Sequence, residues 1–75
     1  MKELVEVIAK ALVEHPDEVV VTQKEEGKHV TLELHVDPSD MGKVIGKQGK
    51  TAKAIRTVVR ASASKSDKKI LVEIQ

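Results

Sequence analysis

The chain has 75 residues, with 13 Lys plus Arg, 12 Asp plus Glu, three His, no Cys and no aromatic residue. This length allows one small domain, residues 1–75, and the lack of Cys excludes a disulfide framework and any thiolate metal site. Because no uninterrupted apolar stretch exceeds three residues, and because charged residues are spread through the first segment, we expect no membrane span, no signal peptide and a cytoplasmic location.

Charge is segregated along the chain. Residues 1–40 hold four basic and ten acidic side chains, whereas residues 41–75 hold nine basic and two acidic ones, so the net charges are −6 and +7. Six of the basic side chains follow one another without an intervening carboxylate: Lys43, Lys47, Lys50, Lys53, Arg56 and Arg60. A surface that serves only solubility intersperses the two signs, so this pattern indicates a polyanion, or the acidic half of another copy, as a partner.

The first half of the chain predicts a helix and a β-hairpin. Residues 3–14 repeat apolar residues at helical spacing, as an amphipathic helix does, and His15-Pro16 ends this helix. A β-branched run predicts a strand over residues 18–24, and strict alternation of apolar and polar residues predicts a second strand over residues 30–36. The turn at residues 25–28 makes the pair an antiparallel hairpin.

The second half predicts two helices and a third strand. A short helix begins after residues 37–40, where Asp37 or Ser39 caps it, and a longer helix covers residues 50–63. Residues 62–68 form a polar loop, and residues 69–75 alternate as a strand. The residues expected to face inward are Met41, Val44 and Ile45 on the short helix and Ala52, Ile55, Val58 and Val59 on the longer one, whose opposite side carries Lys53, Arg56 and Arg60.

The element order α-β-β-α-α-β predicts an α+β fold of two layers, in which three helices cover one face of a three-stranded mixed sheet. The last strand is expected to lie parallel to the second, because the two helices between them provide the long crossover that a parallel pair requires.

Between the two helices lies a segment, Gly46, Lys47, Gln48 and Gly49, that we call the glycine loop. Two glycines three positions apart permit a tight turn and leave the main chain unshielded. The N–H groups at the start of the following helix carry partial positive charge, so a phosphate backbone can approach them closely. A connection between helices favours glycine in any case, but that simpler interpretation leaves the adjacent Val44-Ile45 and the basic run unexplained.

The run from Val44 to Lys50, Val-Ile-Gly-Lys-Gln-Gly-Lys, set in this α-β-β-α-α-β frame, resembles the K-homology (KH) domain in its type II arrangement, over nearly the whole chain. The chain is similar to small bacterial proteins that consist of a single KH domain. The resemblance implies single-stranded RNA binding in the cytoplasm, as a post-transcriptional regulator or RNA chaperone linked to cell elongation and cell-wall control. It also implies a homodimer, or a heterodimer with a larger KH protein of the Jag/KhpB type.

The RNA-binding residues implied by the resemblance are Lys43, Val44, Ile45, Gly46, Lys47, Gln48, Gly49, Lys50, Lys53 and Arg56. The glycine loop would clamp the sugar–phosphate backbone across about four nucleotides, adjacent lysines would contact phosphates, and the two apolar residues before the loop would form a floor for the bases. The longer helix and part of residues 30–36 would form the groove walls. Without an aromatic side chain for stacking, we expect modest affinity per domain, which favours a dimer or a partner with a second site.

The sequence fits an enzyme or a metal-binding protein less well. Gly49-Lys50-Thr51 matches the end of a Walker A loop, but Val44 stands where that motif needs Gly, and the chain is too short for a nucleotide hydrolase. The three His have no companion at metal-ligand spacing, so we expect no metal, no cofactor and no enzymatic activity. The alternative that stays open is a protein-interaction or dimerisation module on the KH scaffold with weak or no RNA binding, which the wide apolar stripe of the first helix favours.

Overall fold

The secondary structure follows the predicted order along the chain. The computed structural model describes residues 2–64 and 67–75, so part of the predicted polar loop, residues 65–66, lies outside the described residues. The elements are α1 (Lys2–Leu12), β1 (Val20–Glu26), β2 (His29–His35), α2 (Met41–Ile45), α3 (Lys50–Ser62) and β3 (Lys69–Ile74), with the 3-10 turns η1 (Pro16–Glu18), η2 (Pro38–Asp40) and η3 (Lys47–Gly49) in the connections. None of the helices described is long and apolar enough to cross a bilayer.

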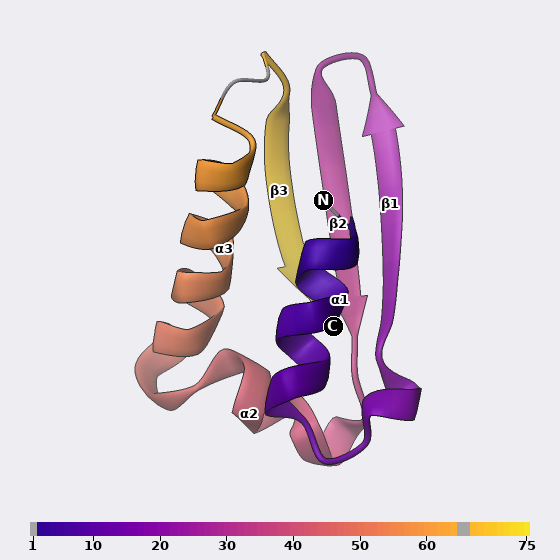
Figure 1. Ribbon diagram of the computed structural model, residues 1–75, viewed down its shortest axis with the longest axis vertical. Helices are drawn as coiled ribbons and strands as arrows, with labels where there is room; N and C mark the ends of the chain where they lie inside the picture. The colour runs from indigo at the N-terminus through magenta and orange to yellow at the C-terminus, as the bar shows by residue number, and fades with distance from the viewer. Residues whose placement is uncertain (1, 65–66) are drawn as a thin grey trace.

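The three strands form one mixed sheet in the order β1-β2-β3. β1 and β2 run antiparallel with Val21 opposite Leu34, and β2 and β3 run parallel with Leu32 opposite Val72. Both strands of the hairpin extend further toward the turn than predicted, so the turn contracts to Gly27-Lys28, whereas β1 begins at Val20 and not at the predicted residue 18. Figure 1 shows α1 in front of the sheet and α3 alongside β3. The predicted α+β fold, with three helices and a mixed three-stranded sheet, is confirmed.

The core lies between the helices and one face of the sheet. Alternate residues of β2 point into it, which is why Val30, Leu32 and Leu34 are almost fully buried while their neighbours are not. Residues four apart on each long helix pack against this face: Val5 and Ala9 on α1, and Ile55 and Val59 on α3. The apolar side chains therefore fix α1 and α3 over the sheet and leave its other face open to solvent.

Two residues that were expected to face the core are exposed instead. The exposed fraction of Ile45 is 38%, and that of Val58 is 44%. Each stands next to a fully buried residue, Val44 or Val59, and successive residues of a helix point about 100° apart. In this packing, each helix buries Val44 or Val59 and turns the adjacent residue toward solvent.

Candidate nucleic-acid interface

The glycine loop joins α2 to α3 through a sharp reversal of the main chain. Gly46 and Gly49 have φ angles of 75° and 74°, and Gln48 between them has a φ of 58°. The N–H of Gly46 donates to the carbonyl of Gly42 at 2.9 Å and closes α2, while the N–H of Gly49 donates to the carbonyl of Gly46 at 3.2 Å. A Cβ on Gly46 would lie 2.2 Å from Oγ1 of Thr51. The reversal thus packs against the first turn of α3 and requires glycine at position 46.

The middle of the glycine loop is open to solvent. Lys47 and Gln48 are both exposed, and within the described part of the chain no carboxylate forms a hydrogen bond with the loop. The first N–H groups of a helix have no partner within it and carry partial positive charge. The N–H groups of Gly46, Gly49 and Lys50 donate within the chain, so the loop presents to an anion its exposed residues Lys47 and Gln48 and the positive end of α3.

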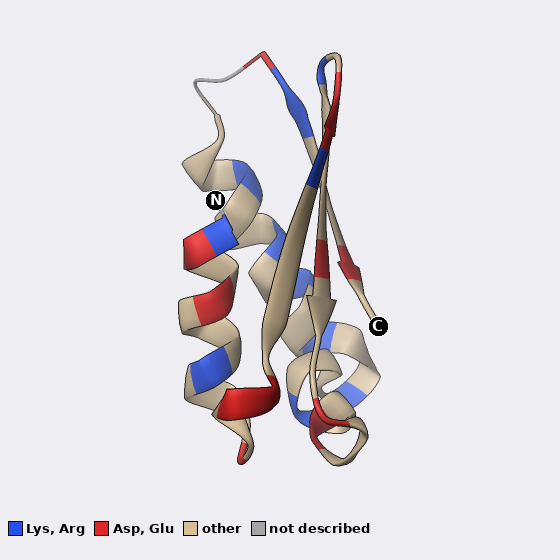
Figure 2. Ribbon diagram, turned by 90° about the vertical axis from the view of Figure 1, so that its right-hand side faces the viewer, with Lys and Arg blue, Asp and Glu red and all other residues tan. Residues whose placement is uncertain are grey.

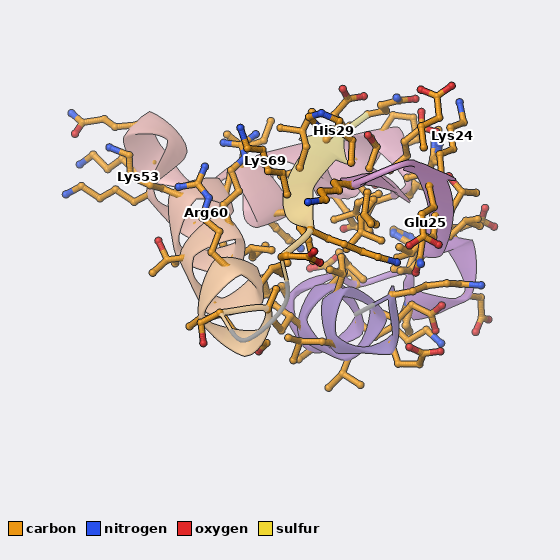
Figure 3. All side chains as sticks on the ribbon, turned by 90° about the horizontal axis from the view of Figure 1, so that it is seen from above. Lys24, Glu25, His29, Lys53, Arg60 and Lys69 are labelled. Carbon is orange, nitrogen blue, oxygen red and sulfur yellow. The ribbon has the colours of Figure 1, made fainter. Side chains whose placement is uncertain are left out.

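Positive charge follows the glycine loop along α3. Among the residues described, five cations of the basic run have no ion-pair partner: Lys47, Lys50, Lys53, Arg56 and Arg60. Figure 3 shows Lys53 and Arg60 on the side of α3 that faces away from α1, whereas Lys24 and Glu25 lie on the far side of the molecule. Since no carboxylate of residues 2–64 and 67–75 forms an ion pair with these cations, they form a surface suited to a polyanion.

Arg56 connects this surface to the sheet. Its side chain is half-buried, and its Nε donates to the carbonyl of Val72 in β3 at 3.3 Å. Because the sheet order places β3 at the edge next to α3, the strand that borders the cationic helix is β3. The predicted wall from residues 30–36 is therefore not at this position, since those residues lie mainly in the central strand β2.

Lys43 has partners within the protein. Its Nζ lies 2.7 Å from a carboxylate oxygen of Glu14 and 3.8 Å from one of Asp40. The ion pair with Glu14 links α2 to the segment that follows α1, whereas Asp40 is the residue directly before α2. The sequence pattern placed Lys43 in the basic run, but the structure surrounds it with acidic side chains from the first half of the chain.

The two apolar residues before the glycine loop differ in their environment. Val44 has no exposed surface and belongs to the core, so it supports α2 from beneath and cannot act as the predicted floor for bases in this structure. Ile45 is partly exposed next to Gly46 and remains available for apolar contact.

A buried carboxylate holds α2 against the end of α1. The exposed fraction of Asp40 is 1%, and among the residues described it is the one charged residue that is buried. Its Oδ1 accepts the N–H of Glu14 at 3.3 Å, and its Oδ2 accepts the N–H of His15 at 3.0 Å and lies 3.0 Å from Nδ1 of the same residue. This pairing could not be predicted from the sequence, because His15 and Asp40 are 25 residues apart and Asp40 resembles one more polar residue of the turn in which Asp37 caps Ser39.

This contact shifts the pKa of both side chains. The hydrogen bond with Asp40 raises the pKa of His15, and the negative charges of Asp40, Asp37 and Glu14 act in the same direction, while partial burial opposes them. Burial disfavours the charged form of Asp40, but hydrogen bonds from His15 and from the N–H groups of Glu14 and His15 keep the pKa of Asp40 below its ordinary value. The pair is therefore stabilised as an imidazolium and a carboxylate.

Within the described ranges, no three His, Asp or Glu side chains are grouped so that they could hold a metal ion. Figure 2 shows that acidic segments gather near η1 and η2, at the end of the molecule where α2 and the start of α3 carry basic residues. The arrangement thus offers charge and main-chain donors for binding.

Comparison with known proteins identifies the family. A family model described as "KhpA/KhpB, KH domain" matches residues 2–74. A Clostridium perfringens protein named RNA-binding protein KhpA is 61% identical over 74 residues, which cover 99% of each chain. Proteins of the same name from Clostridium acetobutylicum and Aquifex aeolicus are 58% and 49% identical over 74 residues, covering 99% of this chain and 99% and 94% of theirs. The family is one of RNA-binding domains and not of enzymes. The chain belongs to the KhpA/KhpB KH-domain family, as the resemblance of its sequence to the type II KH domain predicted.

Proposed function

We propose that this protein binds single-stranded RNA at the glycine loop and along the cationic side of α3. The observation that carries the proposal is the exposed glycine loop, which is bordered by cations that have no anionic partner in the described residues. A polynucleotide supplies the missing negative charge, and its phosphates fit the unshielded main chain of the loop. The relatives' names, RNA-binding protein KhpA, support the same partner.

In the proposed complex, the glycine loop holds the sugar–phosphate backbone across about four nucleotides, and Lys47 and Lys50 contact phosphates. Lys53 lies further along α3, and Arg56 extends toward β3, where the bases would lie. Ile45 provides apolar contact, whereas Val44 acts from the core. Lys43 contributes to the field around the loop while paired with Glu14.

We place this activity in the cytoplasm, in a post-transcriptional regulator or RNA chaperone that acts in cell elongation and cell-wall control. A larger KH protein of the Jag/KhpB type would be the heterologous partner. The support for these cellular roles is the resemblance to single-domain KH proteins together with the family model, which joins KhpA and KhpB under one description.

The test is the double variant Lys47→Asp/Gln48→Asp, measured by fluorescence anisotropy with a labelled single-stranded RNA. Both side chains are exposed, so we expect an unchanged circular dichroism spectrum and a loss of binding, because two carboxylates now face the phosphates. Gln23→Asp/Lys24→Asp is the matched control: it replaces the same two residue types on exposed positions of β1, away from the loop. Undiminished RNA binding by the loop variant, or an equal loss in the β1 control, contradicts the proposed site.

A second candidate function, a protein-interaction module, is favoured by an apolar groove between α1 and α3. The groove has a volume of about 290 Å³ and is lined by Ile8, Leu12, Thr51, Ala54, Ile55 and Val58. Leu12 and Val58 expose 40% and 44% of their surface there. We propose that the same face of a second copy, or of a larger KH partner, covers this groove, which is compatible with RNA binding on the other side of α3.

A further inference from the structure

Asp40 occupies a position that connects two parts of the molecule. Its carboxylate accepts N–H groups of the segment that follows α1, at Glu14 and His15, and its main chain leads directly into α2. The exposed fraction of its side chain is 1%, so water does not compete for these hydrogen bonds. We call Asp40, Glu14, His15 and Lys43 the Asp40 cluster. It fixes the end of α1 to the beginning of α2, six residues before the glycine loop.

The glycine loop needs such support. Gln48 has a φ of 58°, which is unfavourable for a residue with a side chain, and both glycines have positive φ as well. Strained main-chain conformations persist only where the flanking structure holds them in place. On the α3 side, Ala52 and Ile55 are buried in the core. On the other side, the five-residue helix α2 depends on the buried Val44 and on the Asp40 cluster at its first turn.

One member of the Asp40 cluster changes its charge near neutral pH. Nδ1 of His15 lies 3.0 Å from Oδ2 of Asp40, and the exposed fraction of the histidine side chain is 49%, so the ring can exchange protons with solvent. Since an ionised carboxylate only accepts hydrogen bonds, Nδ1 must carry the proton and donate it. Protonation of the other ring nitrogen adds a positive charge to the donor, so the bond then joins an imidazolium to a carboxylate and becomes stronger.

The charged groups around His15 are predominantly acidic. Asp37, Asp40 and Glu14 act on it, and Lys43 is the cation of the cluster, already paired with Glu14 at 2.7 Å. His15 also lies three residues beyond the last residue of α1, near the helix end where the dipole favours a positive charge. The surroundings therefore favour the imidazolium, and the pKa of His15 is raised.

The direction of the pH dependence follows from these shifts. The pKa of His15 is raised in the folded protein, so its stabilising contribution is complete below the ordinary value of about 6.5 and is lost as the pH rises through the raised value. The pKa of Asp40 is lowered, so its contribution is present above the ordinary value of about 3.9 and is lost as the pH falls through the lowered one. The fully charged pair exists between these two limits.

We propose that Asp40 is a positioning residue for the glycine loop, and that protonation of His15 tightens the Asp40 cluster and raises the affinity of the loop for RNA. The inference rests on the proposed function for its RNA part, while its structural part concerns the free protein alone. A tighter cluster keeps α2 in the orientation that presents the loop, so the loop loses less conformational entropy when it binds RNA.

The first test uses the free protein. We expect the amide resonances of Gly46 and Gly49, followed by ¹⁵N NMR between pH 5.5 and 8.5, to titrate with the same midpoint as the His15 ring, above about 6.5. His15→Gln keeps a side-chain donor without a titrating group, so the loop amides should lose this transition. His29→Gln is the matched control, since His29 lies in the hairpin and outside the cluster, and it should retain the transition. If the loop amides do not follow the His15 ring, or still titrate in His15→Gln, the proposal is overturned.

The second test measures the affinity for a labelled single-stranded RNA at pH 6 and pH 8 at constant ionic strength. Between pH 6 and pH 8, we expect the affinity of the wild type and of His29→Gln to fall at least about fivefold more than the affinity of His15→Gln does. An equal loss in His15→Gln overturns the coupling to RNA. Absence of RNA binding by the wild type at both pH values rejects the proposed function instead, and the NMR titration then still decides whether the Asp40 cluster positions the loop.

Discussion

At the scale of single residues, Gly46 and Gly49 look equivalent in the sequence but differ in the structure. Both have φ near +75°, where a side chain costs about 1–2 kcal/mol. A Cβ on Gly49 would meet nothing within 4 Å, whereas one on Gly46 would lie 2.2 Å from Oγ1 and 2.9 Å from the main-chain N of Thr51. We predict that Gly49→Ala lowers the melting temperature by about 5–15 °C and that Gly46→Ala lowers it further, measured by thermal unfolding.

Gly42→Ala is the control for this pair. Gly42 lies in α2 without a positive φ, and a Cβ there would have open space. Because Ala is a better helix former than Gly by about 1 kcal/mol, we expect an unchanged or higher melting temperature. If Gly42→Ala destabilised the protein as much as Gly46→Ala, the tight packing against Thr51 could not be the cause.

At the scale of elements, α3 presents two different sides to solvent. One side carries the cations that follow the glycine loop, and the other lines the apolar groove with α1. Val58 stands in that groove with 44% of its surface exposed. We predict that Val58→Asp shifts a self-associating sample toward monomer in sedimentation equilibrium, since a carboxylate cannot be buried there without a partner, and that it changes RNA affinity less than about threefold per site.

Val7→Asp is the matched control for the groove. Val7 is 67% exposed on α1 and does not line the groove, so the same substitution there should leave the association unchanged. A monomer at high micromolar concentration in the wild type would reject the homodimer, and the groove would then have to be tested with a larger KH protein.

At the scale of the whole molecule, the structure shows where the basic and acidic halves of the chain lie. The basic half of the chain supplies α2, the glycine loop and α3, whereas acidic residues gather near η1 and η2 (Figure 2). Only Lys43 of the basic run is neutralised by that acidic region, in the part of the chain that the structure describes. Binding through the remaining cations should release counterions and weaken steeply with salt.

We predict that the slope of log K against log salt is about −3 for a single-stranded RNA, as expected for about four phosphate contacts. Lys53→Gln should make the slope less steep by about 0.7, because one phosphate contact is lost. Lys10→Gln on α1 removes the same charge away from the loop and should leave the slope unchanged. Equal slopes in all three proteins would argue against phosphate contact by Lys53.

Much of the fold could be predicted because its signals are local. The alternation in residues 30–36 depends on which side of a strand each residue faces, and it predicted the burial of Val30, Leu32 and Leu34. The glycine loop was likewise visible, because two glycines between helical patterns need no distant partner. Errors occurred where helical spacing left a choice: Ile45 and Val58 both lie beside a buried residue, and only packing against the sheet decides which of the two turns inward.

By itself, the sequence determined the order of helices and strands, the α+β class, the family and the position of the glycine loop, since each follows from residues that are neighbours along the chain. Only the tertiary structure decided that Asp40 holds His15, that Lys43 is paired with Glu14, and that β3 rather than β2 borders α3. These contacts join residues far apart in the sequence. They form only when the burial of the apolar side chains brings the end of α1, the start of α2 and the edge of the sheet together, and no local pattern encodes that meeting.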